Sequence, residues 1–184
     1  PDLPWEEHGF YANGTVIYDK QDKLFKAWVH LWKHKGKELA ATTGLYAYMT
    51  SSNGVAWKKP LVNKAEKTNR ILPPGGDAVG FAGQGVMKDV HDDNPARRYK
   101  MLYNSEPDGT SKSLQIGAAY SPDGIRWTAE SRNPLIPFGD TQSVPLWDPQ
   151  RRSYLGFVRT GPPNIRGIAR IESRDFVHWS PKVT

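Results

Sequence analysis

The chain has 184 residues, a formal net charge of +6 and no cysteine. This length fits a single domain, and the lack of cysteine excludes disulfides, thiolate catalysis and cysteine-ligated zinc. Hydrophobic residues make up 38% of the chain and aromatic residues 11%, which is too apolar for disorder, and no stretch approaches the roughly 20 apolar residues of a membrane span. With 17 Gly and 15 Pro, the composition predicts short strands joined by tight turns rather than a helical bundle.

The basic residues do not follow the pattern of a nucleic-acid-binding surface. The clearest basic pairs are Lys58-Lys59, Arg97-Arg98 and Arg151-Arg152, and each lies close to Pro or Asp residues that are typical of a hairpin. The sequence contains no long run of like charges. We therefore expect solvated loop tips, and neither a nucleic acid nor a membrane as a partner.

The first predicted unit contains three apolar runs and a turn motif. The runs cover residues 16–19, 24–31 and 44–50. In the third run Leu45, Ala47 and Met49 alternate with the residues of the other face, which is the pattern of a strand. The motif Ser-Ser-Asn-Gly-Val-Ala-Trp at residues 51–57 then turns the chain into a fourth, outer strand, which we expect to begin near Trp57.

Two further units repeat this order. The runs of the second unit cover residues 86–89, 99–103 and 114–120, and those of the third cover residues 145–148, 154–158 and 165–171. Each third run leads into a motif of the same form, at residues 121–127 and 173–179. The turns between the first and second runs are rich in Asp, Asn and Pro, as hairpin connections are. No stretch longer than about ten residues has a helical period.

The spacing of the motifs indicates an internal repeat. The same number of residues separates Asp19 from Trp57 and Asp89 from Trp127. Four antiparallel strands, repeated roughly every 50–70 residues, are typical of β-propeller blades. We therefore predict an all-β fold in which residues 1–184 form one partial β-propeller domain of about three four-stranded antiparallel blades. The predicted blade units cover residues 9–62, 80–136 and 139–184.

A propeller usually closes with four to eight blades, which is more than this chain supplies. Either the chain is a piece of a larger propeller, or its open blade faces pair with another copy; we favour the first interpretation. An open wedge of three blades would expose apolar patches and promote self-association. The chain begins at Pro1 without a basic and apolar leader, which fits a processed product or a piece of a longer protein.

The repeated motif has a structural explanation. The side chain of Asn53 or Asp123 is placed to accept hydrogen bonds from backbone N–H groups two residues further on, and Gly54 and Gly124 supply a positive φ. The Trp that ends each motif is expected to pack between neighbouring blades. These acidic residues are therefore poor candidates for catalysis.

Residues 173–179 resemble the Ser-x-Asp-Leu-x-x-Trp element of five-bladed propeller glycoside hydrolases of families 32 and 43, which include invertase, levanase, arabinanase and xylosidase types. Residues 95–103, and residues 139–142 followed by 147–149, resemble a bacterial group related to family 32. The resemblance extends over almost the whole chain but covers only part of a five-bladed propeller. Sialidase Asp-boxes match less well, because they have one more residue between Asp and Trp. The resemblance implies carbohydrate as the partner, no cofactor, and a bacterial secreted or periplasmic location.

The resemblance also implies acidic residues at the starts of the innermost strands. Glycoside hydrolysis needs two carboxylates, one as general acid and the other as nucleophile or base. The best candidate is Asp140, directly ahead of an inner strand, although a turn-capping role is equally open. Asp77 is either a second channel acid or a loop residue, and Glu7, next to Glu6, is a third candidate.

Uncharged residues at the same strand starts are candidates for substrate binding. We expect the innermost strands to start near Asn13, Gln84 and Gln142, whose amides would face the channel. Tyr11 is an aromatic residue that would stack on a sugar ring, although most aromatic residues in such a fold belong to the core between blades.

The sequence departs from the family pattern in important places. It contains no Asp-Pro-Asn-Gly nucleophile motif, no Arg-Asp-Pro motif and no Glu-Cys acid motif. We therefore expect glycosidase activity from a full-length parent and an inactive isolated fragment. The alternative is a non-catalytic propeller that binds carbohydrate or another protein. No metal is expected: the spacing of His30 and His34 would suit a shared ligand on a helix, whereas residues 24–31 are a predicted strand.

Overall fold

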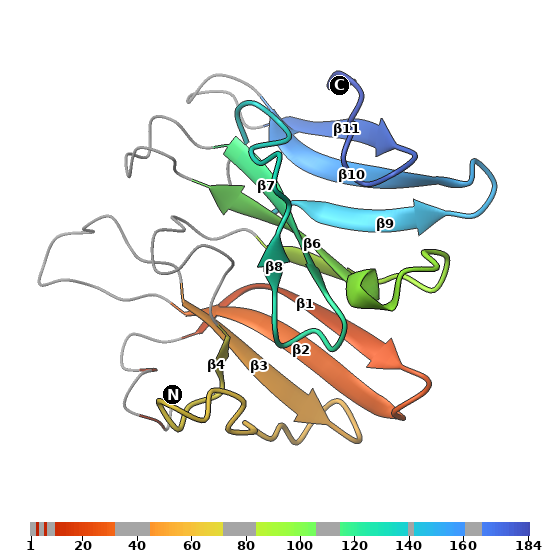
Figure 1. Cartoon of the computed structure of the whole chain (residues 1–184). Coiled ribbons are helices and arrows are strands. Elements are labelled where there is room, and N and C mark those ends of the chain that lie inside the picture. The colour runs from red at the N-terminus through yellow and green to blue at the C-terminus, as the bar shows by residue number, and fades with distance from the viewer. Residues whose placement is uncertain are drawn as a thin grey trace, which may run out of the picture.

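A computed structural model of the chain describes residues 3, 6, 10–31, 45–71, 84–105, 115–139, 142–160 and 167–184. These residues form three antiparallel sheets, which follow one another from the bottom to the top of Figure 1 and which we call blades 1, 2 and 3. A three-residue 3₁₀-helix, η2 (Pro95–Arg97), interrupts the strands. The all-β prediction is confirmed. Within the described residues no helix is long and apolar enough to cross a membrane.

Blade 1 contains four strands in sequential order: β1 (Phe10–Asp19), β2 (Leu24–Leu31), β3 (Leu45–Ser51) and β4 (Arg70–Ile71). The expected outer strand beside Trp57 is reduced to a bridge between Thr50 and Lys58. Pro60 follows at once, and because proline has no N–H to donate to a ladder, the chain pairs with β3 again only at β4.

Blades 2 and 3 repeat this arrangement. Blade 2 contains β5 (Gly85–Lys88), β6 (Tyr99–Ser105), β7 (Gln115–Ser121) and β8 (Thr128–Ala129), which begins directly after Trp127 as expected. Blade 3 contains β9 (Val144–Asp148), β10 (Ser153–Thr160) and β11 (Gly167–Ser173). A bridge between Arg170 and Val183 occupies the edge of β11 where the other blades have a fourth strand.

The core lies between the blades rather than within them. One apolar cluster, between blades 1 and 2, includes Trp28, Tyr48 and Met101, and Trp127 packs against it. The second cluster, between blades 2 and 3, includes Leu102, Ile116, Tyr154 and Phe176, and Trp179 packs against it. A single sheet cannot bury both of its faces, so each blade depends on its neighbours.

The three turn motifs have the same hydrogen-bond pattern. Each acidic or amide side chain accepts bonds of 2.8–2.9 Å from two backbone N–H groups, at Asn53, Asp123 and Asp175. Positive φ angles of 75° and 78° fall on Gly54 and Gly124, as predicted. The structural interpretation of the motif is therefore confirmed.

A buried carboxylate joins each blade to the next at the hairpin end. Asp19, at the end of β1, accepts hydrogen bonds from Lys26 of its own blade (2.9 Å) and from Lys88 (2.7 Å) and the Tyr99 hydroxyl (2.7 Å) of blade 2. Burial opposes the ionisation of Asp19, but these three donors hold its pKa well below the usual range.

Blade 2 makes the same contact with blade 3. Asp89, at the end of the inner-strand segment, is fully buried, lies 3.0 Å from the Lys100 amine and accepts a 2.6 Å hydrogen bond from the Tyr154 hydroxyl. Lys100 also donates to Asp92 at 2.6 Å. We call this arrangement of aspartate, own-blade lysine and next-blade tyrosine the inter-blade contact.

The inter-blade contact makes a testable prediction at Tyr99. The change Tyr99→Phe removes a hydroxyl that both donates to Asp19 and accepts from Lys26. Because hydrogen bonds to buried charged groups contribute about 1.5–3 kcal/mol, we expect the free energy of unfolding to fall by that amount in urea titrations. Tyr18→Phe, at a half-exposed tyrosine, is the control and should change stability by less than about 0.5 kcal/mol. Equal losses in both variants would contradict the assignment.

Candidate functional site

The starts of the three inner strands, β1, β5 and β9, meet at the end of the molecule opposite the hairpins. The side-chain amide of Gln142 donates a 2.8 Å hydrogen bond to the carbonyl oxygen of Gly14, which joins the approach to β9 to β1. The backbone N–H of Val86 donates a 3.0 Å bond to Thr15 Oγ1, which joins β5 to β1. Groups from all three blades therefore converge here, and we call this end of the molecule, around Gly14, Gln84, Gln142 and Ser143, the channel end.

Glycine permits the close approach of β5 to β9. A Cβ atom at Gly85 would collide with the carbonyl oxygen of Ser143, and it would lie 2.6 Å from the Cδ of Pro145. The backbone of blade 2 therefore contacts that of blade 3 directly at the channel end, and only glycine fits at this position.

The channel end holds buried polar groups without partners. Gln84 is fully buried, and neither its Oε1 nor its Nε2 has a hydrogen-bond partner within the described part of the chain. The Oγ of Ser143, also fully buried, is unpaired among the same residues. Native proteins pair nearly all such groups, so Gln84 and Ser143 mark a place where the described residues do not complete the polar contacts.

The structure places the predicted binding residues as follows. Gln84 and Gln142 both lie at the channel end, one residue ahead of β5 and two residues ahead of β9, near the strand starts that were expected. Tyr11 and Asn13 lie on β1, where the pairing with β2 shifts in register between Tyr11 and Gly14. The side chains of Tyr11 and Asn13 are not among those described.

The predicted acids are largely outside the described residues. Asp140, Asp77 and Glu7 all lie there, so their roles stay predictions. Glu6 is described: it is fully buried, and its Oε2 lies 2.6 Å from the Lys59 amine. The carboxylate of Glu6 is therefore used in an ion pair within the chain.

His30 is a buried titratable group that was not among the predicted site residues. It lies on β2, paired with Tyr11 near the start of β1, and its ring centroid is 5.7 Å from that of Tyr46. Burial lowers the pKa of His30 to about 4, so the imidazole is neutral at pH 7. Lys26, Trp28 and His30 are every second residue of β2, so their side chains lie on the same face of blade 1. Lys26 and Trp28 contact blade 2, and this alternation was the signal in the sequence that His30 faces blade 2 as well.

A polar group from blade 2 lies beside the channel end. The amide of Asn133 donates hydrogen bonds to the Tyr103 hydroxyl (3.1 Å) and to the carbonyl of Ala118 (2.8 Å). Burial raises the pKa of Tyr103, so its hydroxyl stays protonated. Gly85 pairs with Leu102 in the antiparallel register of β5 and β6. One residue further along both strands, the same register places Gln84 next to Tyr103.

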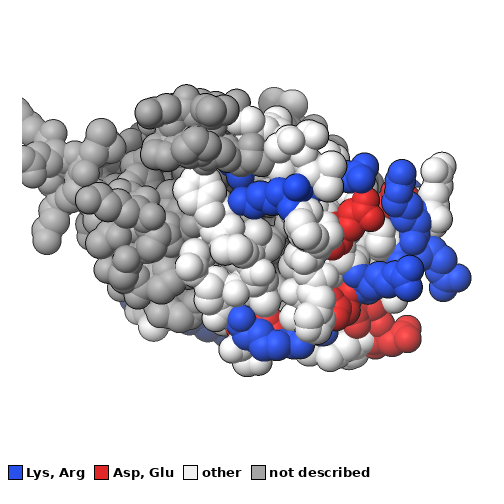
Figure 2. Space-filling model, turned by 90° about the horizontal axis from the view of Figure 1, so that it is seen from above, with Lys and Arg blue, Asp and Glu red and all other residues white. Residues whose placement is uncertain are grey.

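Charged side chains gather at the other end of the molecule. Figure 2 shows Lys, Arg, Asp and Glu side chains of the viewed face concentrated where the hairpins of Figure 1 lie. Asp89 and Asp92 share Lys100 there, and Asp148 pairs with Arg151 at 2.7 Å. Within the described residues, no group of three His, Cys, Asp or Glu side chains is placed to hold a metal ion. The acids of the hairpin end are therefore occupied by cations of the chain itself.

Neither a family model nor a curated protein matches the sequence, whereas solved structures do. The chain is similar to a fructofuranosidase from Schwanniomyces occidentalis complexed with fructose (TM-score 0.67, 18% identity). It is also similar to an N-acetylgalactosamine deacetylase from F. plautii in complex with blood group B trisaccharide (TM-score 0.66, 14% identity). A third match belongs to the GH130 family, whose glycoside hydrolases target β-1,2 mannosidic linkages (TM-score 0.66, 16% identity).

These matches cover nearly all of this chain but only part of the other proteins. The shares are 94%, 100% and 98% of this chain, against 35%, 54% and 50% of the three others. At such low identity the likeness establishes the fold alone. The chain therefore has the fold of consecutive blades from the five-bladed β-propeller of GH32 and GH130 glycoside hydrolases, and it spans about a third to a half of the matched chains.

The neutral state of His30 predicts a pH dependence. Because its pKa falls from 6.5 to about 4 on folding, the unfolded chain binds a proton that the folded chain does not between these values. The contribution to stability is complete above about pH 6.5 and decreases as the pH falls toward 4, by up to about 1.4 kcal/mol per pH unit.

Denaturant titrations between pH 7 and pH 4.5 test this expectation. His30→Gln should flatten the pH dependence, whereas His91→Gln, at an exposed histidine whose ring stacks on Trp147, should leave it unchanged. A slope that persists in His30→Gln would assign the effect to another group.

Proposed function

We propose that the channel end binds carbohydrate and that the full-length protein hydrolyses a glycosidic bond there. The observation that carries this proposal is the convergence of strands from three blades at this end, where the amide of Gln84 and the hydroxyl of Ser143 have no partner among the described residues. Sugars present many hydroxyl groups that donate and accept, so they match unpaired amides better than an apolar or a purely anionic ligand does. The propeller fold shared with carbohydrate-active enzymes supports the proposal.

The proposed reaction uses two carboxylates across the scissile bond. Asp140, two residues ahead of the channel-end residue Gln142, would act as one of them, and Asp77 or Glu7 as the other. A protonated carboxyl gives its proton to the leaving glycosidic oxygen, and the second carboxylate attacks the anomeric carbon or activates water. Gln142, Gln84, Asn13 and Tyr11 would bind the sugar.

The sequence departures favour one alternative. The chain lacks the Asp-Pro-Asn-Gly, Arg-Asp-Pro and Glu-Cys motifs of the resembling enzymes. A propeller that binds carbohydrate without cleaving it would keep the unpaired amides and need no acid pair. Both functions predict that the protein binds sugar, and only the hydrolase function predicts that it cleaves the sugar.

The activity test uses the full-length gene product. It is assayed against fructans, β-1,2-mannosides and aryl glycosides, with Asp140→Asn as the variant and Asp93→Asn, at an exposed hairpin residue, as the control. Because general acid or base catalysis contributes about 10²–10⁴-fold, we expect Asp140→Asn to lose at least 100-fold in kcat. Retention within a few-fold would remove Asp140 from the mechanism. Binding without turnover would establish the non-catalytic alternative.

A substitution at Gln84 tests whether this residue binds sugar or only stabilises the fold. Gln84→Met keeps the side-chain volume and removes an amide that is unpaired within the described residues. Replacing such a group with an apolar one is neutral or stabilising, so the midpoint of urea unfolding should stay the same or rise. Sugar affinity, measured by calorimetry on the full-length protein, should fall by about tenfold or more. A tenfold loss corresponds to about 1.4 kcal/mol, the size of one hydrogen bond between uncharged groups. Unchanged affinity would contradict the binding role.

A further inference from the structure

We propose that a pocket between the hairpins of blades 2 and 3 binds a carboxylate that is carried on a six-membered ring. The pocket has a volume of about 430 Å³ and is lined by His91, Trp147, Pro149 and Arg152. This volume lies within the roughly 300–1,000 Å³ of small-molecule sites. We call it the hairpin pocket. It lies at the end opposite the channel end, so the inference does not depend on the proposed function.

Both walls of the hairpin pocket come from consecutive blades of the chain. His91 lies in the β5–β6 connection of blade 2. Trp147 lies on β9, and Pro149 and Arg152 lie in the β9–β10 connection of blade 3. The pocket therefore belongs to the interface of blades 2 and 3, which the chain itself supplies on both sides, and not to an outer blade face.

Trp147 occupies the position in blade 3 that Lys88 has in blade 2. Each of them lies on the inner strand of its blade and pairs with a tyrosine of the second strand, Tyr99 for Lys88 and Tyr154 for Trp147. Both side chains contact the connection between the first two strands of the preceding blade.

His91 in turn occupies the position of Gln21. Each is the second residue after a buried aspartate, and its backbone N–H donates to that carboxylate: Gln21 to Asp19 at 3.1 Å, and His91 to Asp89 at 2.8 Å. The two interfaces therefore bring the same pair of positions together, with different side chains.

The different side chains change the contact. Between blades 1 and 2, the Lys88 amine donates to Asp19 at 2.7 Å and to Gln21 at 3.4 Å, which fills the interface with an ion pair. Trp147 carries no charge, and its ring stacks on that of His91 with centroids 4.7 Å apart and an interplanar angle of 22°. Between blades 2 and 3, two rings beside a pocket therefore replace the ion pair of these positions.

The side chains that line the hairpin pocket offer hydrogen-bond donors and no carboxylate. The guanidinium of Arg152 and the indole N–H of Trp147 are donors only. Arg152 is exposed and forms no ion pair within the described part of the chain, whereas the nearby Asp148 pairs with Arg151 at 2.7 Å. A ligand of this pocket must therefore supply the acceptor atoms and the negative charge.

The lining also indicates the kind of anion. The planar fork of an arginine matches the two oxygens of a carboxylate, and a single arginine without a lysine suits one negative charge better than the two of a phosphate. The rings of His91 and Trp147 provide a flat surface on which an aromatic or a sugar ring can pack. Both an aromatic acid and a uronic acid sugar have this chemistry, a carboxylate on a six-membered ring.

An NMR titration of the ¹⁵N-labelled full-length protein tests the proposal. The probes are benzoate and galacturonate, their uncharged counterparts benzyl alcohol and galactose, and acetate as a carboxylate without a ring. The indole N–H signal of Trp147, assigned by its loss in Trp147→Phe, should shift saturably with at least one of the two ring acids. A response to benzoate alone would identify an aromatic acid, and a response to galacturonate alone an acidic sugar. Acetate should bind at least about tenfold more weakly, because it lacks the ring contact.

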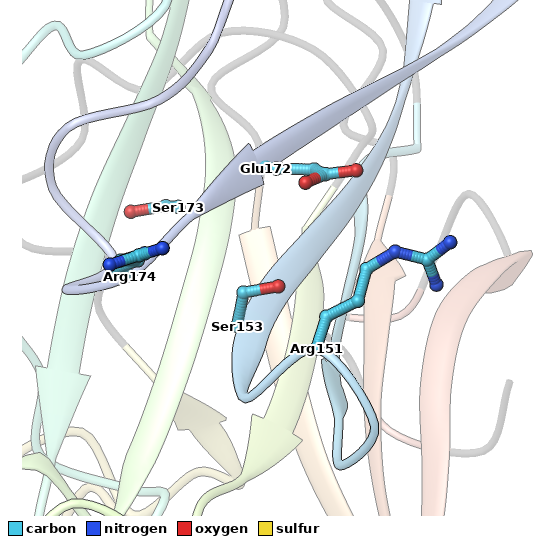
Figure 3. Close-up of a pocket in the computed structure, with 5 residues that line it drawn as sticks. All are labelled: Arg151, Ser153, Glu172, Ser173 and Arg174. Carbon is cyan, nitrogen blue, oxygen red and sulfur yellow. The ribbon is translucent and has the colours of Figure 1, made fainter.

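Two neighbouring arginines provide the variant and its matched control. Arg152→Gln removes the cation of the hairpin pocket, so the affinity for the ring acid should fall by about tenfold or more. Arg151→Gln removes the same charge from the preceding residue, which lines a different pocket together with Ser153 and Glu172 (Figure 3). At about 0.15 M salt long-range attraction is screened, so this control should bind within about twofold of the parent protein. Unchanged midpoints of urea unfolding would show that both variants are folded.

Three results would overturn the proposal. The first is the lack of a saturable shift with either ring acid up to about 10 mM, which is tenfold weaker than a millimolar complex. The second is binding of acetate or of the uncharged counterparts as tight as that of the ring acids, and the third is an equal loss in the two arginine variants. Gln84→Met, at the channel end, should leave the Trp147 shift unchanged, which keeps this result separate from the test of sugar binding there.

Discussion

The inter-blade contact determines how the blades are arranged. Asp19 and Asp89 are buried, and an unpaired carboxylate in such a place would cost several kcal/mol. Each is neutralised by a lysine from its own blade and receives a hydroxyl from the next, so the carboxylate is satisfied only when two blades stand in one register. The inner strand β5 spans only Gly85–Lys88. Fixing its hairpin end therefore also fixes the place where it starts, at the channel end.

The two ends of the molecule carry buried groups of different chemistry. At the hairpin end, carboxylates hold the blades together, and their pKa values are lowered by the cations and hydroxyls that they contact, as at Asp19 and Asp89. At the channel end, the described buried groups without partners are uncharged, as Gln84 and Ser143 are. If the channel end binds carbohydrate, as we propose, the ligand meets the neutral groups of Gln84 and Ser143 there, and the carboxylates that hydrolysis needs are the predicted residues Asp140, Asp77 and Glu7.

Local patterns in the sequence predicted the strands, their order and the turn motifs, because alternation and the Asp-turn geometry depend on residues that are close in sequence. They also predicted Gln84 and Gln142 at the strand starts. The inter-blade contact was not predictable in the same way: Lys26 and Tyr99 are 73 positions apart, and nothing local shows which faces meet. The outer strand of blade 1 begins next to Trp57 as expected but stays a single bridge for a local reason, since Pro60 interrupts the pairing.

The fold restricts where a site can form more strongly than it restricts the chemistry of that site. Side chains in the middle of a blade are used for packing against the next blade, and the hairpin-end acids are used for the inter-blade contact. Near the starts of β5 and β9, beside β1, the described residues bring groups from three blades to one place. This chain therefore has a fold similar to both a fructofuranosidase and a deacetylase, although these two enzymes differ in activity. Under the proposed function, the choice between cleavage and binding therefore depends on Asp140 and the other predicted acids, and not on the residues that build the scaffold.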